Sequence, residues 1–117
     1  MALPVPRFTL YQAWLEQRLG RRFDRYEALW QWSVSDLAGF WRSIWDWFDI
    51  QSPALPTAVI ERASMSGTVW FPGTRVSFAR QVLRHGPRAD AAGHPALGFQ
   101  DERRAEPEAL PWPELTR

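Results

Sequence analysis

Residues 23–50 read FDRYEALWQWSVSDLAGFWRSIWDWFDI and hold five of the chain's eight tryptophans. From residue 37 onward the apolar side chains recur at intervals of three and four positions, which is the spacing of one broad face of an amphipathic helix. That face comprises Leu37, Phe40, Trp41, Ile44, Trp45 and Phe48, while Ala38, Gly39, Arg42, Ser43 and Asp46 fall on the other side. Each large aromatic side chain can bury about 150–250 Å². We therefore expect a helix over about residues 35–48 that docks against a large surface.

A first helix is expected over about residues 9–19. Thr9 is followed three residues later by Gln12, which is a capping-box pattern, and Gly20 is suited to end the helix. The apolar side chains that line its expected inner face are Tyr11, Trp14, Leu15 and Leu19.

A second, shorter helix is expected between the first helix and the long one. Asp24 with Glu27 three residues on repeats the cap-like pattern and predicts a helix that ends at about Trp32. Ser33 or Ser35 can then cap the long helix. Because the connectors are short, we expect these three helices to be neighbours in space.

The middle of the chain is typical of short strands. Two prolines in residues 51–58, QSPALPTA, break the helical pattern. Residues 58–62 and 68–71 are short β-prone runs, and the SMSG sequence between them indicates a turn. The Trp-Phe-Pro-Gly sequence of residues 70–73 is expected to end the second strand.

The last third of the chain is expected to alternate between helix, loop and hairpin. A helix is predicted from Thr74 to about His85, and the Gly- and Pro-containing residues 86–95 are typical of a loop. Residues 96–102 and 109–112 are predicted to form the two strands of a hairpin. The PELTR sequence that follows resembles the first turn of a helix.

These elements predict an α+β fold that is mainly helical. We expect a Trp-rich helical extension over residues 1–57, short strands, a turn, a helix and a loop over 58–95, and a hairpin with a helix start over 96–117. An isolated two-stranded hairpin is marginal in water, and a helix of one turn cannot propagate. We therefore expect the chain to be the front end of a longer protein, truncated where a large domain opens.

Composition excludes several classes of function. The 117 residues suit one domain at most, and a hydrophobic content of 45% with mixed charges indicates a globular protein. A formal net charge of +1 provides no field to attract nucleic acid or an anionic membrane, so we expect neither as a partner. Without cysteine there are no disulfides or thiolate ligands. No signal peptide or long apolar run is present, so a cytoplasmic location is expected.

The absence of lysine restricts the chemistry further. All 14 basic residues are arginine. A Walker-type phosphate loop, a Schiff-base enzyme and a lysine-assisted adenylation site each need a lysine, which this chain cannot supply by itself.

The residues that could carry chemistry do not form a recognisable constellation. His85 and His94 are the only histidines, and a metal site would need more ligands at a known spacing. Ser64 and Ser66 lack the surroundings of a nucleophile elbow. The carboxylates that could pair as acid and base lie in a polar loop, where solvated carboxylates are common; they are Asp101, Glu102, Glu106 and Glu108.

Two binding interpretations are also weak. Gly67 and Gly73 flank TVWFP, but there is no glycine-rich phosphate cradle. Arginine interleaved with tryptophan is typical of proteins that bind single-stranded nucleic acid. Trp41 and Trp45, however, share a helix face with aliphatic residues, so core packing explains them better. We therefore expect no catalytic, cofactor-binding or metal-binding residue in this chain.

Three stretches carry a resemblance to a known family. Residues 23–50, with their WSV…FW…W spacing, resemble the N-terminal segment of the acetoacetyl-CoA synthetases. MSGTVWFPGTRVSFARQVLR (65–84) is similar to the family's Trp-Phe-Pro-Gly stretch leading into a helix. LGFQDE (97–102) and LPWPEL (110–115) are similar to the hairpin and helix start of its large domain. The family belongs to the AMP-forming acyl-CoA synthetases and is related to acetyl-CoA synthetase.

The resemblance implies that the complete enzyme converts ATP and acetoacetate to an acyl-adenylate and then transfers the acyl group to CoA, with Mg²⁺ accompanying ATP. It also implies that the family's phosphate loop, adenylate-binding acidic residue and catalytic lysine lie downstream, so no functional residue is carried over to this chain. The expected partner is the remainder of the ligase chain, and exposed aromatic surface is expected to favour self-association of the isolated piece. The alternative is a stand-alone helical interaction module or a gene remnant.

Overall fold

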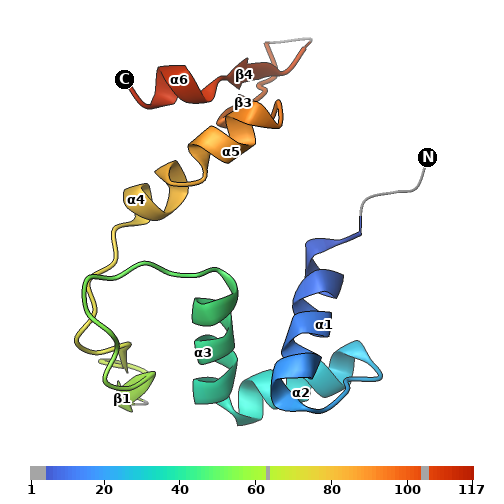
Figure 1. The fold of residues 1–117 in the computed structure, drawn as a ribbon, viewed down its shortest axis with the longest axis vertical. Coiled ribbons are helices and arrows are strands. Elements are labelled where there is room, and N and C mark those ends of the chain that lie inside the picture. Colours follow the sequence, from blue (N-terminus) through green and yellow to red (C-terminus); the bar gives the residue numbers. More distant parts are fainter. Residues whose placement is uncertain (1–4, 63, 104–105) are drawn as a thin grey trace. The chain divides into compact units, whose positions relative to one another are not determined.

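A computed structural model describes residues 5–62, 64–103 and 106–117 of the chain. Figure 1 shows its elements in chain order. They are α1 (Arg7–Leu19), α2 (Tyr26–Ser35), α3 (Leu37–Trp47), β1 (Ile60–Arg62), β2 (Val69–Trp70), α4 (Phe78–Leu83), α5 (Gly86–Ala91), β3 (Leu97–Phe99), β4 (Glu108–Leu110) and α6 (Trp112–Leu115). The prediction of a mainly helical fold with short strands is confirmed. The contacts divide the chain into two compact units, Met1–Arg75 and Val76–Arg117.

Helix α1 begins earlier than the capping-box pattern predicts. The carbonyl of Pro6 accepts a hydrogen bond from the backbone N–H of Leu10 at 3.3 Å, so the helix begins at Arg7 and Thr9 lies inside it. No side chain caps this end, and the predicted capping box is therefore wrong. The predicted C-cap is confirmed, because Gly20 adopts φ 63° and donates its N–H to the Glu16 carbonyl.

The boundary between α2 and α3 is set by an aspartate. Ser33 and Ser35 lie inside α2, where their hydroxyls donate back to carbonyls three residues upstream. Asp36 instead caps α3, because its Oδ1 accepts from the backbone N–H of Gly39 at 2.9 Å. The predicted serine caps are wrong, and α2 continues to Ser35 instead of ending at Trp32. Its own N-cap is Arg25, without a side-chain cap, so the cap-like pattern at residues 24–27 also fails.

The buried core of the first unit lies among the three helices. Its members are Tyr11, Leu15, Phe23, Leu29 and Trp32, with Trp14, Phe40, Ile44 and Trp47 packed against them. The phase predicted for α3 is therefore wrong in part. Ser43, expected on the polar side, is 4% exposed, whereas Leu37 is 41% and Trp41 39% exposed.

Helix α3 has a second apolar neighbour, which explains the shift in phase. The Trp41 ring lies 5.5 Å from that of Trp70, and the Trp45 ring lies 4.6 Å from that of Phe71. The rings of Trp41 and Trp45 thus pack on the β1–β2 segment, while a different side of the helix meets α1 and α2. One helix consequently divides its aromatic residues between two surfaces.

The β1–β2 segment forms an antiparallel pair, as the β-prone runs predict, although both strands are shorter than expected. A turn occupies residues 65–67, as the SMSG sequence indicates. Phe71 adopts φ 46°, a left-handed conformation that is unusual for a residue with a side chain. It is held there by hydrogen bonds from its N–H to the Val59 carbonyl (2.8 Å) and from the Thr74 N–H to its own carbonyl (3.2 Å).

In the second unit, the predicted helix over residues 74–85 is confined to α4. Ser77 is extended and its hydroxyl accepts from the Arg80 N–H at 3.3 Å, so the helix begins only at Phe78. The loop predicted over residues 86–95 is wrong in its first half, which forms α5. Pro87 lies in the first turn of α5, where a backbone N–H has no acceptor within the helix, so proline is tolerated there. The proline that indicates a helix break in the sequence therefore marks the start of a helix.

The end of the second unit contains the strand pair β3–β4 and the single turn α6. The strands are antiparallel, with Leu97 opposite Leu110 and Phe99 opposite Glu108. Residues 104–105 of the expected polar loop lie outside the described residues. Whether this pair opens a large ligase domain stays a prediction. Gly86 packs so closely on α6 that a Cβ there would lie 2.8 Å from Trp112.

Candidate interaction site

An apolar groove of about 300 Å³ lies in the first unit, where α1, α2 and α3 meet. Residues lining it are Arg7, Phe8, Tyr11, Tyr26, Leu29, Trp30, Ser33, Phe40, Ile44, Trp47 and Phe48. We call this set the aromatic groove. Its floor is formed by core residues, so its position is fixed by the packing of the three helices.

The rim of the aromatic groove carries four large side chains that remain exposed. Exposed fractions are 46% for Phe8, 64% for Tyr26, 51% for Trp30 and 57% for Phe48. Single exposed apolar residues are ordinary, but several around one hollow mark a site for another molecule or segment. The rings of Phe8 and Tyr26 lie 6.1 Å apart and join α1 to α2 along the rim.

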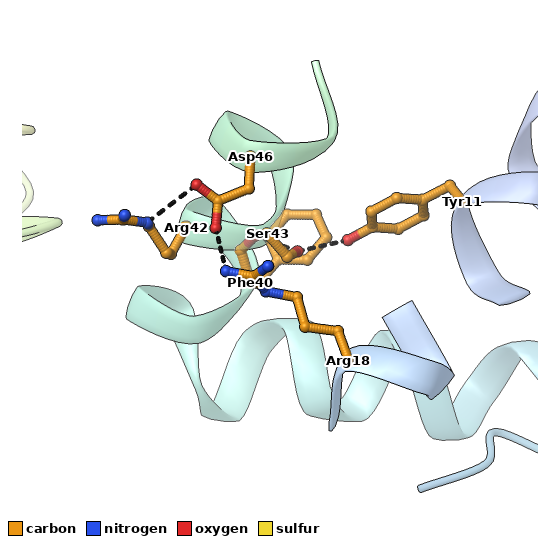
Figure 2. A network of polar contacts seen from close by, with 6 residues as sticks. All are labelled: Tyr11, Arg18, Phe40, Arg42, Ser43 and Asp46. Atoms are coloured by element: carbon orange, nitrogen blue, oxygen red, sulfur yellow. Dashed lines mark hydrogen bonds and ion pairs between the residues drawn. The ribbon is translucent and has the colours of Figure 1, made fainter. Parts of the chain in front are cut away.

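A buried pair of hydroxyls links the floor of the groove to α3 (Figure 2). The Ser43 hydroxyl donates to the Phe40 carbonyl at 2.7 Å, which uses its one proton. The 2.7 Å contact between Tyr11 Oη and Ser43 Oγ therefore has Tyr11 as the donor. Burial raises the pKa of the Tyr11 hydroxyl, and the hydrogen bond with Ser43 offsets part of the rise, so this group stays protonated near neutral pH.

An ion-pair network lies on the polar side of α3 (Figure 2). Asp46 accepts from Arg18 at 2.5 Å and from Arg42 at 3.1 Å. The Arg18 guanidinium also lies 5.4 Å from the ring centre of Trp14. Because both arginine side chains are about half exposed, each pair stabilises the unit by no more than about 1 kcal/mol. The network orients α1 on α3, and its geometry offers no reactive group.

A carboxylate closes the turn after α1. Glu16 Oε1 accepts from Gln12 Nε2 at 3.0 Å and from the backbone N–H of Phe23 at 2.8 Å. The side-chain hydrogen bond from Gln12 and then the backbone bond from Phe23 lower the pKa of Glu16. These contacts hold the buried Phe23 ring against the helices.

The residues that sequence reasoning weighed for chemistry lie elsewhere and are not gathered into one site. His85 is the N-cap residue of α5. Ser64 donates to the Ser66 carbonyl at 2.7 Å, and Asp101 accepts from the Arg103 N–H at 2.9 Å. In the described part of the chain, no three histidine, aspartate or glutamate side chains are grouped as metal ligands. None of the weighed residues lines the aromatic groove.

Sequence reasoning missed the groove, although α2 carries a signal for it. Tyr26, Leu29, Trp30 and Ser33 recur at the helical spacing of one face. Trp32 points to the core instead, so α2, like α3, has aromatic residues on two sides. A helix with aromatic residues all round indicates more than one contact surface.

Within residues 5–62, 64–103 and 106–117, no helix is long and apolar enough to cross a membrane.

Comparison with known proteins gives a consistent family. Residues 26–82 match the family described as acetyl-coenzyme A synthetase N-terminus. The chain is 31% identical over 102 residues to acetoacetyl-coenzyme A synthetase of Rhizobium meliloti (strain 1021), and 34% identical over 68 residues to acetoacetyl-CoA synthetase of Gallus gallus. The structure resembles that of the acetoacetyl-CoA synthetase from Streptomyces lividans with a TM-score of 0.75 and 35% identity.

The matches cover most of this chain but a small share of each relative. The alignments span 87%, 56% and 93% of this chain, respectively, but only 15%, 10% and 17% of the three relatives. The chain is therefore similar to an N-terminal segment of much longer proteins.

Proposed function

We propose, from the premise that residues 26–82 belong to the acetyl-coenzyme A synthetase N-terminus family, that the chain is the structural N-terminal portion of an acetoacetyl-CoA synthetase-like ligase. The observation that carries the proposal is the extent of the match. It begins with the first residue of α2 and reaches the last turn of α4, so it includes α3, the β1–β2 pair and the Phe71 turn.

In this proposal the complete, AMP-forming enzyme works in two steps. The carboxylate oxygen of acetoacetate attacks the α-phosphorus of ATP, pyrophosphate leaves, and an acyl-adenylate forms. The thiol of CoA then loses its proton and its sulfur attacks the acyl carbonyl, AMP leaves with its phosphate oxygen, and the thioester remains. ATP, Mg²⁺ and CoA bind to the remainder of the polypeptide. We place the enzyme in the cytoplasm on the sequence argument alone.

Neither the composition of the sequence nor the described residues support a site for those groups in this chain. The sequence contains no lysine, and the described residues hold no group of three metal-ligating side chains. We therefore assign no step of the reaction to them. Their role is structural: the α1–α3 core holds the aromatic groove in shape for the rest of the ligase.

A chimera tests the proposal. In it, this chain replaces the matching N-terminal residues of the Rhizobium meliloti enzyme, and formation of acetoacetyl-CoA from ATP, acetoacetate and CoA is measured. The controls are the unaltered enzyme and the isolated chain, which should release no pyrophosphate. We expect an active chimera. A chimera that is folded by circular dichroism but makes no thioester would contradict the proposed function.

A further inference from the structure

We propose that the aromatic groove seats an apolar segment that carries a carboxylate and belongs to the ligase polypeptide outside these 117 residues. This inference rests on the proposed function and adds to it the surface that is used and the chemistry of its occupant. It moves the docking role from the Trp41 and Trp45 face, which the β1–β2 segment already contacts, to the part of the unit that holds the aromatic groove.

The exposed rings of the groove favour an apolar occupant. Four rim side chains remain about half exposed or more around a single hollow, while the core beneath them is closed. Covering such rings removes apolar surface from water, which is the main source of favourable free energy in association. The occupant must therefore present apolar side chains to Phe8, Tyr26 and Trp30.

The charge in the groove favours an anionic group on the occupant. Arg7 is the single charged residue in the groove lining. Across residues 5–62, 64–103 and 106–117, the structure gives its guanidinium no ion-pair partner. A cation at one end of an apolar groove favours an occupant with an anionic group at the matching position, and arginine binds a carboxylate in a bidentate way. A carboxylate on the docked segment is the simplest partner for it.

The size and shape of the groove favour a single segment as occupant. A space of about 300 Å³ is at the lower end of the range for binding pockets, about 300–1,000 Å³, so it takes a few side chains of one segment instead of a domain face. A second copy of this chain fits poorly, because a symmetric dimer places the same patch on both partners and one hollow does not fill another.

The length of the related polypeptides favours an occupant from the same chain. The relatives extend far beyond the region that this chain matches, which is 15% of the Rhizobium meliloti enzyme and 17% of the Streptomyces lividans enzyme. A segment joined covalently to the groove has a high effective concentration, so modest contacts suffice to hold it.

Thiol labelling in two contexts tests the occupancy. The chain has no cysteine, so Tyr26→Cys introduces one thiol on the groove rim, and Leu55→Cys introduces a matched control at a side chain 84% exposed outside the groove. Each variant is prepared in the isolated chain and in the chimera with the Rhizobium meliloti enzyme. The rate of maleimide labelling is read from the peptide that contains the new cysteine. We expect labelling at position 26 to be at least tenfold slower in the chimera, with less than a twofold change at position 55.

The carboxylate is tested by charge at position 7. In the Tyr26→Cys chimera, Arg7→Glu should speed labelling at least threefold, whereas Arg7→Lys should retain the protection. Equal labelling of position 26 in both contexts, in a chimera that makes thioester, overturns this inference and leaves the proposed function standing. Protection at both positions, or protection that Arg7→Glu does not change, also overturns it as stated. A chimera without these substitutions that is folded by circular dichroism but makes no thioester overturns the proposed function itself.

Discussion

The hydroxyls of Tyr11 and Ser43 form a directed chain whose energy can be measured with a double-mutant cycle. Tyr11 Oη donates to Ser43 Oγ over 2.7 Å, and Ser43 Oγ donates to the Phe40 carbonyl over 2.7 Å. Tyr11→Phe removes one hydrogen bond but leaves Ser43 its own acceptor, so it should cost about 0.5–1.5 kcal/mol of unfolding free energy. Ser43→Ala leaves the Tyr11 hydroxyl without an acceptor in a side chain only 7% exposed, which costs about 1–3 kcal/mol.

Alanine is a better helix former than serine by about 0.5 kcal/mol, which reduces the apparent loss in Ser43→Ala. The cycle cancels this difference, because the Ser43→Ala step occurs with and without Tyr11. We expect a coupling free energy of about 1 kcal/mol between the two positions. Urea unfolding followed by tryptophan fluorescence gives all four free energies, provided that the m-values agree. Losses that add to within about 0.3 kcal/mol would refute the directed chain.

Three further predictions concern the two units. Leu15→Ala removes a side chain that is 0% exposed and should lower the free energy of unfolding by about 2–5 kcal/mol in urea melts. Trp41→Ala, at a side chain 39% exposed, should lower it by about 1–2 kcal/mol. Equal losses of unfolding free energy would contradict the phase of α3. Because the pKa of Glu16 is lowered on folding, its stabilising contribution is present above its unfolded pKa and is lost as pH falls through its lower folded pKa. In Glu16→Gln, the free energy of unfolding should therefore fall less steeply as the pH is lowered through the acid range. Gly86→Ala places a Cβ 2.8 Å from the Trp112 ring. It should change the near-UV circular dichroism spectrum and lower the free energy of unfolding by about 1–3 kcal/mol. An unchanged spectrum and an unchanged urea melt would contradict the close packing of Gly86 on Trp112.

Local signals in the sequence predict the elements well where a single residue decides the geometry. Gly20 ends α1 because the left-handed cap favours a residue without a Cβ, so the position of the glycine in the sequence predicts the end of the helix. Spacing on α1 predicts the burial of Tyr11 and Leu15 correctly, but it also places Leu19 on the inner face, and Leu19 is 40% exposed. Cap assignments are less secure, because Asp36, Ser33 and Ser35 are all good N-cap residues and only the observed hydrogen bonds select among them.

The phase of α3 could not be predicted in full, for a physical reason. Periodicity identifies one apolar face, but α3 packs against two partners, so its apolar residues cover a wider arc than one face. Trp47 falls outside the predicted face yet packs on the core, and Ser43 is buried because Tyr11 satisfies its hydroxyl. The aromatic groove depends on how three helices meet, which no single helical pattern contains.

The division of aromatic residues on α3 also bears on function. Helix α3 packs Trp41 and Trp45 on the β1–β2 segment and turns Phe40, Ile44 and Trp47 to the core, and its polar side holds Arg42 and Asp46, which are paired with each other. The stretch that the sequence shows as a docking face is therefore mainly internal to the first unit. Arg7, for which the described residues supply no ion-pair partner, lines the groove together with the exposed rings of Tyr26 and Trp30. If the chain supports a larger ligase, we expect the contact to be made at this groove, to which α3 contributes Phe40, Ile44 and Trp47 and its C-cap residue Phe48.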